Sequence, residues 1–302
     1  MDAARWIDYW VVDVFTEEPF RGNPAGVVLD AGGLAGETMR LIAREMGSTE
    51  TVFAFPCDKK GFDLCLRWFT ATCEVPFSGH ATLAALHVLA ETGRHSSTAP
   101  VTLDTLAGPL KGWPATSTGQ GFPRVEVPLP YLEPAPFGLE RLTPALLVPA
   151  DALAPDLPLL REGLSLLVPF ANQQALLNLR PDFRQLSRLG LEHDITAFVC
   201  FARKAAGQGA HWYLRLFAPG IGISEDPVSG SAHAAACTYL LAQEVLSTPQ
   251  AKEGIWTGSQ GDNLDRHGQV QVEVTFDDQG QPTRVRISGP AITTMQGRLR
   301  VA

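Results

Sequence analysis

Two short segments of the chain place chemically useful side chains beside a glycine that opens a predicted helix. They contain Ser78, Gly79 and His80 in the first and Asp226, Ser229, Gly230 and Ser231 in the second. The first N–H groups of a helix lack intrahelical partners and lie at its positive end, and glycine lets a ligand approach the backbone. Both segments are therefore predicted to bind an acid group, such as a carboxylate or an enolate-like oxygen. The alternative is that the glycines only allow the helices to pack against strands.

Glu50 is a third candidate group, because its surroundings favour proton transfer. It follows a predicted helix over residues 36–46 and precedes the apolar strand 52–55. Apolar neighbours desolvate a carboxylate, raise its pKa and make it a usable acid or base near neutral pH. A solvated loop glutamate is the alternative interpretation.

The two glycine segments belong to a longer internal repeat. Residues 66–90 and 214–241 both read as a strand, a loop, a glycine turn and an apolar helix that begins in the first copy at about Ala81. Once three extra residues are allowed in the second loop, these pairs coincide: Leu66/Leu214, Arg67/Arg215, Phe69/Phe217, Gly79/Gly230 and Ala81/Ala232. A separation of about 150 residues is too long for a solenoid repeat. The repeat predicts two related domains that face one another, each presenting the start of a helix.

The order of predicted elements indicates an α+β fold. Strands precede and follow one long helix in each half, which favours two pseudo-symmetric domains, each a curved and mostly antiparallel sheet wrapped around a central helix. Prolines recur over residues 123–149, as in an interdomain linker, and residues 258–263 (GSQGDN) read as a loop. We predict domains over residues 1–127 and 128–290, with residues 291–302 able to pack back on the first domain.

Composition excludes several classes of function. The 302 residues are 45% hydrophobic and 19% charged, as in a soluble globular protein, and 32 acidic against 24 basic residues give a net charge of −8. This charge argues against nucleic acid or an anionic membrane as partner. The start of the chain is unlike a signal peptide, and no apolar run is long enough to span a bilayer. Five cysteines without a CxxC pair fit free thiols in a reducing compartment, so we expect a cytoplasmic protein.

Known cofactor motifs are missing from the sequence. Neither GxGxxG after a strand nor GxxxxGK[ST] occurs, and no HExxH or Cys/His cluster has metal-ligand spacing, so we expect neither cofactor nor metal. Ser231, His80 and Asp226 could form a nucleophilic triad, but the GxSxG elbow of such hydrolases is missing.

Four blocks of sequence together resemble the phenazine-biosynthesis (PhzF-like) isomerase family, which has the diaminopimelate-epimerase fold. They are residues 12–28, 44–53, 67–85 and 225–235, and the resemblance covers essentially the whole chain. It implies cofactor-free proton transfer on a small carboxylate-bearing substrate, in a cleft between two similar domains of a homodimer.

The resemblance also implies roles for the candidate residues. Glu50 matches the family's acid/base glutamate, His80 the histidine that meets the substrate, and Asp226 the aspartate across the cleft that orients that histidine. Ser231 matches the serine at the second helix start, and amides around Gly79 and Gly230 would hold the substrate's acid group.

One departure from the wider fold bears on the reaction. Epimerases of this superfamily carry a cysteine before each glycine, where this chain has Ser78 and Ser229. A serine hydroxyl is too weak an acid to alternate with its anion, so a single carboxylate moving a proton within one substrate fits better than two-base stereoinversion. A racemase or epimerase of the same fold and a non-catalytic small-molecule-binding protein remain the alternatives. The family is broader than its namesake, so a role in phenazine synthesis is not implied.

Overall fold

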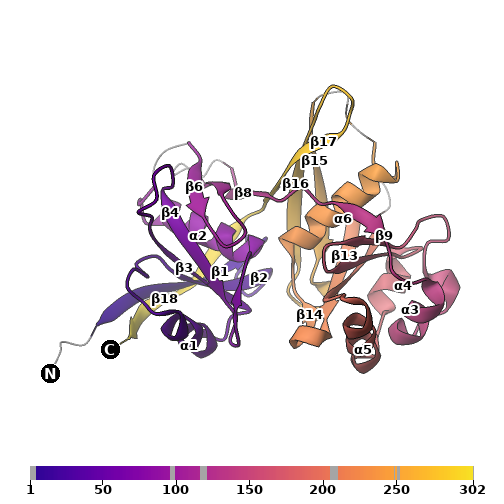
Figure 1. Cartoon of the computed structure of the whole chain (residues 1–302), viewed down its shortest axis with the longest axis horizontal. Helices are drawn as coiled ribbons and strands as arrows, with labels where there is room; N and C mark the ends of the chain where they lie inside the picture. The colour runs from indigo at the N-terminus through magenta and orange to yellow at the C-terminus, as the bar shows by residue number, and fades with distance from the viewer. Residues whose placement is uncertain are drawn as a thin grey trace. The chain divides into compact units, whose positions relative to one another are not determined.

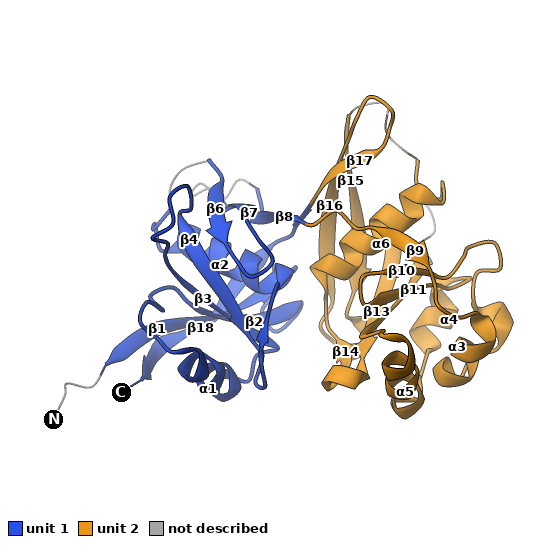
Figure 2. Cartoon of the chain, in the orientation of Figure 1, with its two compact units in different colours: residues 1–127, 286–302 blue, residues 128–285 orange. Residues whose placement is uncertain are grey.

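The chain forms two compact units, shown in blue and orange in Figure 2. The computed structural model describes residues 5–95, 99–115, 121–204, 210–247, 249 and 252–301. Unit 1 consists of residues 1–127 and 286–302, and unit 2 of residues 128–285. The predicted second domain extends to residue 290, whereas unit 2 ends at Val285, inside strand β17 (Pro282–Ser288).

Unit 1 is a mixed sheet with one helix on each face. Its strands are β1 (Trp6–Val14), β2 (Asn23–Val28), β3 (Glu50–Pro56), β4 (Leu64–Phe69), β5 (Glu74–Val75), β6 (Val101–Asp104), β7 (Leu110–Trp113), β8 (Arg124–Val127) and β18 (Ala291–Arg300). Its helices are α1 (Gly36–Met46) and α2 (Gly79–Glu91). Strand β1 lies antiparallel between β2 and β18, and β3 lies parallel to β2 and antiparallel to β4. The C-terminal strand β18 thereby completes the N-terminal sheet.

Unit 2 repeats this order of elements. Its strands are β9 (Leu132–Pro134), β10 (Leu160–Glu162), β11 (Ser165–Pro169), β12 (Ala197–Arg203), β13 (Trp212–Ala218), β14 (Ile223–Asp226), β15 (Glu253–Gln260), β16 (Gly268–Phe276) and part of β17. Its helices are α3 (Leu139–Leu146), α4 (Gln173–Asn178), α5 (Phe183–His193) and α6 (Gly230–Ala242), with short 3-10 turns at Ala150–Ala152, Pro219–Ile221 and Asp262–Leu264. Strand β12 is parallel to β11 and antiparallel to β13, as β3 is to β2 and β4.

The helices α2 and α6 are the cores of the two units (Figure 1). Ten of the thirteen residues of α2 and eleven of the thirteen of α6 are buried. A helix that is apolar on all sides must be enclosed, and here curved sheet encloses it: α2 packs on β1, β2, β3, β7 and β8. The predicted α+β architecture is therefore confirmed. Helix α2 begins at Gly79 rather than at the expected Ala81, because Ser78 caps it.

Helix α1 covers the other face of the sheet in unit 1. It spans the predicted residues, and Met39, Ile42 and Ala43 pack in a cluster that contains Phe53 and Phe69. The helix ends at Gly47, whose φ of 68° lies in the left-handed region that glycine adopts without strain. Glu50 follows three residues later.

The same type of ion pair marks the internal repeat in both units. In unit 1, Arg67 donates two hydrogen bonds of 2.7 Å to Glu74 and lies over the Phe69 ring at 5.0 Å. In unit 2 the same arrangement, with hydrogen bonds of 2.8 Å and a ring distance of 5.0 Å, is made by Arg215, Glu225 and Phe217. The repeat seen in sequence is thus a repeat of structure, β4–β5–α2 against β13–β14–α6.

The prediction of a loop at residues 258–263 is wrong in its first half. Strand β15 continues through Gly258 to Gln260, and the turn begins at Gly261, with φ 95°. Gly258 is required by packing, because a Cβ there would lie 2.2 Å from His233 Nδ1 and 2.4 Å from Trp212 Nε1. The proline-rich stretch is also more regular than a linker, since it contains β8, β9 and α3.

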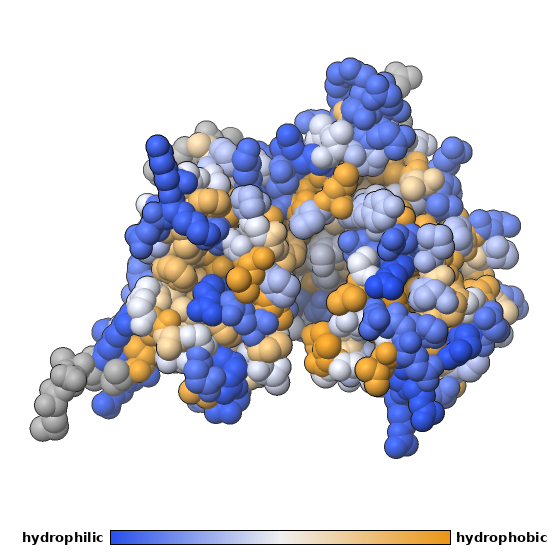
Figure 3. Space-filling model, viewed as in Figure 1, coloured by the Kyte–Doolittle hydropathy of each residue, from blue (hydrophilic) through white to orange (hydrophobic). Residues whose placement is uncertain are grey.

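The surface of both units mixes hydrophilic and hydrophobic residues, as the visible face in Figure 3 shows. Among the residues that the structure describes, no helix has the length and apolar character needed to cross a membrane.

Candidate active site

Glu50 stands at the start of β3, beside the first turn of α2. The Ser78 hydroxyl donates a hydrogen bond to Glu50 Oε2. The same oxygen of Ser78 caps α2 by accepting from the N–H of Ala81 at 3.4 Å. Since a serine hydroxyl carries one proton, the cap interaction leaves that proton for the carboxylate. The helix cap and the carboxylate are therefore coupled through one side chain.

Burial governs the protonation of Glu50. Its side chain is 17% exposed, and burial raises the pKa of this carboxyl above its usual value, while the hydrogen bond from Ser78 lowers the pKa to a smaller extent. This is the direction expected from its apolar neighbours. A glutamate with a raised pKa can give and take a proton nearer neutral pH than an exposed one.

His80 lies beside the same carboxylate. Its Nδ1 is 3.6 Å from Glu50 Oε2 and 3.5 Å from Ser78 Oγ, and its side chain is 7% exposed. Three of the predicted site residues, distant by up to 30 positions in sequence, thus form one cluster in unit 1.

Gly79, between Ser78 and His80, is needed for packing. A Cβ at this position would lie 2.7 Å from Ile287 Cδ1. The structure therefore supports the packing interpretation for the missing side chain of Gly79. The amide at the helix start is a separate feature, which does not depend on the missing side chain.

The predicted residues of unit 2 surround the start of α6. Asp226 ends β14, Ser229 caps α6 by accepting from Ala232 N at 3.4 Å, and Ser229 Oγ is 3.3 Å from the hydroxyl of the exposed Ser231. This group belongs to unit 2, whereas the Glu50 cluster belongs to unit 1.

Gln260 holds the unit 2 group in place, a role that sequence analysis did not predict. Its Oε1 accepts from Ser229 N at 3.0 Å, and its Nε2 donates to Asp226 O at 2.8 Å. The residue is 1% exposed. It therefore fixes the backbone on both sides of the segment that joins β14 to α6. The signal was hidden because Gln260 lies in the glycine-rich stretch that we expected to be a loop.

His233, in the second turn of α6, is a neutral packing residue. Trp212 Nε1 donates to its Nδ1 at 2.9 Å, and the residue is fully buried. Burial lowers its pKa to about 3, although an interaction with the Gln260 side chain opposes this shift. An imidazole that remains neutral across the physiological range supports the α6 scaffold and carries no charge to a substrate.

Strand register shows that only unit 1 has a carboxylate at the Glu50 position. Phe69 of β4 pairs with Thr51, and its repeat partner Phe217 of β13 pairs with Phe198. The residue before Thr51 is Glu50, and the residue before Phe198 is Ala197. By the same reasoning Asp226, which pairs with Leu216, has Val75 as its unit 1 equivalent, because Val75 pairs with Trp68. The polar groups of the two copies have therefore diverged while the scaffold has not.

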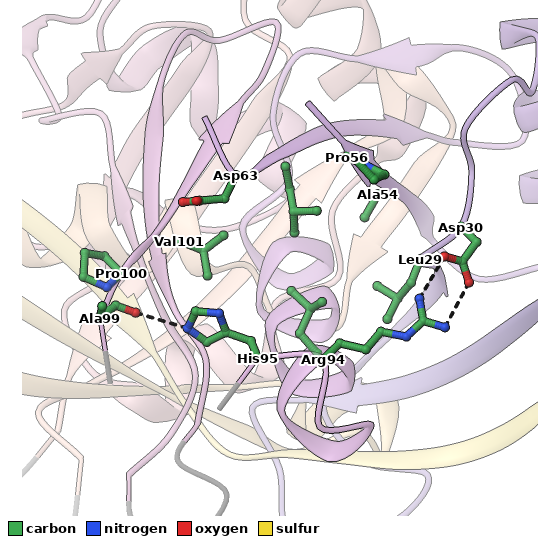
Figure 4. Close-up of a pocket in the computed structure, with 12 residues that line it drawn as sticks. Leu29, Asp30, Ala54, Pro56, Asp63, Arg94, His95, Ala99, Pro100 and Val101 are labelled. Carbon is green, nitrogen blue, oxygen red and sulfur yellow. Dashed lines mark hydrogen bonds and ion pairs between the residues drawn. The ribbon is translucent and has the colours of Figure 1, made fainter. Parts of the chain in front are cut away.

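A cavity of about 400 Å³ lies elsewhere in unit 1, between the ends of β2 and β3 and the C-terminal end of α2 (Figure 4). Arg94 donates two 2.9 Å hydrogen bonds to Asp30 there, and His95 lies 3.3 Å from the Ala99 carbonyl oxygen. These polar groups satisfy one another. Neither Glu50 nor His80 lines the cavity, so it is separate from the candidate active site.

Comparison with known proteins assigns the chain to a family. Residues 12–297 match the family model PhzC-PhzF, described as phenazine biosynthesis-like protein. The chain belongs to the PhzC-PhzF family. The uncharacterized isomerase YddE of Escherichia coli K12 is 35% identical over 287 residues, covering 93% of this chain and 94% of the relative. The uncharacterized isomerase CA_C3446 of Clostridium acetobutylicum is 31% identical over 306 residues, covering 98% of each.

Solved structures of PhzC-PhzF proteins share the fold. The Bacillus anthracis phenazine biosynthesis protein of the PhzF family matches with a TM-score of 0.86 and 25% identity, covering 98% of this chain and 99% of that one. A hydroxyproline epimerase from Agrobacterium vitis matches with a TM-score of 0.63 and 12% identity, covering 99% and 94%, which supports the epimerase-type fold alone. The family and its relatives identify this chain as an enzyme of the isomerase class.

Proposed function

We propose that this PhzC-PhzF protein is a cofactor-independent isomerase that moves a proton within a small carboxylate-bearing metabolite. Glu50 removes a proton from carbon and returns it to another atom of the same substrate. The observation that carries this proposal is the placement of Glu50 under Ser78 and beside His80, with a pKa raised by burial.

The lone carboxylate favours isomerisation over stereoinversion. A two-base racemase needs an acid/base group on each side of the substrate carbon, and the unit 2 equivalent of Glu50 is Ala197. Ser78 and Ser229, which cap α2 and α6, stand at the two positions where an epimerase is expected to have cysteine. Their hydroxyls are poor acids. Of the other thiols, Cys237 is buried, and burial raises its pKa, which keeps it protonated.

Residues near Glu50 assist the reaction in this proposal. His80 stabilises charge that develops on the substrate. The amides at the start of α2 bind the acid group, because unpaired N–H groups at a helix start favour an anion. General acid–base help of this kind contributes roughly 10²–10⁴-fold in rate. The functional assembly is a homodimer, which sedimentation equilibrium would test by yielding twice the chain mass.

Deuterium exchange tests the proposal. Candidate small carboxylic acids are incubated with the protein in D₂O and followed by proton NMR and chiral chromatography. Isomerisation gives deuterium at carbon in a rearranged product, with loss of exchange in Glu50→Gln. Exchange with inversion and no rearrangement would instead identify a racemase or epimerase. Saturable binding without any label would identify a binding protein and overturn the catalytic proposal.

A further inference from the structure

Two thiols and a carboxylate converge at the end of β3 remote from Glu50. Cys57 follows β3, Cys65 lies in β4, and Asp104 ends β6, where it is the direct cross-strand partner of Cys65. One ligand atom from each residue lies within 4.8 Å of the other two. The spacing of these residues in sequence, 8 and 39 positions, matches no metal motif, so only the fold brings them together.

The distances in this cluster suit a tetrahedral ion. Cys57 Sγ is 3.9 Å and Cys65 Sγ 3.7 Å from the same oxygen, Asp104 Oδ2. In a tetrahedral zinc site with Zn–S near 2.3 Å and Zn–O near 2.1 Å, a sulfur and an oxygen ligand stand about 3.6 Å apart. Both sulfur–oxygen distances are therefore within a few tenths of an ångström of those around a shared tetrahedral ion.

We propose that Cys57, Cys65 and Asp104 form a binding site for a thiophilic divalent cation of the Zn²⁺ class, with solvent as the fourth ligand. Thiolate sulfur selects zinc-like ions over Mg²⁺ and Ca²⁺, which prefer all-oxygen sites. The three residues are half-buried, which leaves a route for the ion from solvent.

Lys59 pairs with the carboxylate of this cluster. Its Nζ lies 2.8 Å from Asp104 Oδ2, and its side chain is 66% exposed, so it can move into solvent. Binding forms two S–metal bonds and one O–metal bond, releases the two thiol protons to solvent and transfers no electron. The cluster thus exchanges two protons for one dication, so the total charge of the two cysteines, Asp104 and the ion is conserved.

The site is independent of the proposed catalysis. Glu50 and Cys57 are seven residues apart along an extended strand, which corresponds to about 23 Å. Failure of metal binding would therefore leave the isomerase proposal intact, and the reverse also holds.

Cobalt titration of the untagged protein tests the inference. Co²⁺ should produce a near-ultraviolet thiolate-to-metal band that saturates at one ion per chain and disappears when Zn²⁺ is added. Cys57→Ser and Cys65→Ser should each weaken binding by at least about 10–100-fold, the loss that even outer-shell changes cause. Cys73→Ser is the matched control, because it removes an exposed thiol outside the cluster, and it should retain the band.

A second measurement needs no variant. Calorimetry in buffers of different ionisation enthalpy should show two protons released per Zn²⁺ bound. The inference is overturned by a missing thiolate band, by a band that survives in both cluster variants, or by Zn²⁺ binding without proton release. A Cys57–Cys65 disulfide that forms under glutathione disulfide in a protein that binds no Co²⁺ would also overturn it and assign these thiols to redox chemistry.

Discussion

Replacing Glu50 by glutamine separates catalysis from stability. Glutamine keeps the shape of the side chain and an oxygen that can accept from Ser78, but it cannot carry a proton between atoms. Loss of general acid–base catalysis should lower exchange by roughly 10²–10⁴-fold. At about 1.36 kcal/mol per tenfold, this is about 2.7–5.4 kcal/mol of transition-state stabilisation.

The same change should leave the fold nearly as stable as the parent. A hydrogen bond to a charged acceptor contributes about 1.5–3 kcal/mol and one to a neutral acceptor about 0.5–1.5 kcal/mol, so about 1 kcal/mol is lost at Ser78. The desolvation cost of the ionised carboxylate, which raises its pKa, disappears and offsets that loss. We expect a net change within about 1 kcal/mol, or a shift of a few degrees in Tm.

The stability difference between Glu50→Gln and the parent should depend on pH. The pKa of Glu50 in the fold lies above its usual value, so the unmodified protein loses stability as pH rises through the folded-state pKa. Glu50→Gln has no such loss. The difference in unfolding free energy between variant and parent should therefore move in favour of the variant as pH rises.

The assay is deuterium incorporation into substrate, with urea unfolding of the same samples over a range of pH. Glu45→Gln is the matched control, since Glu45 is an exposed glutamate of α1 five residues away, and it should retain exchange. Exchange in Glu50→Gln within tenfold of the parent would refute the assignment of Glu50 as acid and base. Collapse of folding in this variant would refute the stability reasoning.

Two further pairs of substitutions use the internal repeat as its own control. Ser78→Ala should raise the pKa of Glu50 further and move the acidic limb of the pH–rate profile for exchange to higher pH. Ser229→Ala removes the same type of helix cap and should cost a similar ~1 kcal/mol of stability without moving that limb. An unshifted acidic limb in Ser78→Ala would contradict the coupling of Ser78 to Glu50. Arg215→Ala should lower the free energy of urea unfolding by about 3–5 kcal/mol, because the Arg215 and Glu225 side chains are only 6% and 11% exposed. Arg67→Ala should lower it by only about 1 kcal/mol, because the Arg67 and Glu74 side chains are 32% and 23% exposed. Equal losses would show that burial does not set the energy of these ion pairs.

The sequence predicted the parts of the fold that local patterns determine. The α1 residues and the left-handed Gly47 followed from helical spacing and C-cap chemistry. The apolar segments that form α2 and α6 revealed the repeat, and hence the two related halves. These features depend on a few adjacent residues, so they can be read from the chain alone.

The parts that were missed depend on contacts between distant residues. Gly258 is a strand residue because Trp212 and His233 fill the space of its Cβ, and no local pattern reports that packing. Gln260 and the cluster of Cys57 with Asp104 are likewise assembled by strand pairing. Motifs of short spacing cannot reveal groups that meet only across a sheet.

The alignment of Glu50 with Ala197 has a consequence for engineering. Each position is the first residue of a strand, and a serine caps a helix later in the same unit. Unit 2 therefore keeps the backbone arrangement of the Glu50 site but has alanine in place of the carboxylate. A single change, Ala197→Glu, would place an acid under Ser229 as Glu50 lies under Ser78. This one substitution would therefore give each unit its own acid/base group.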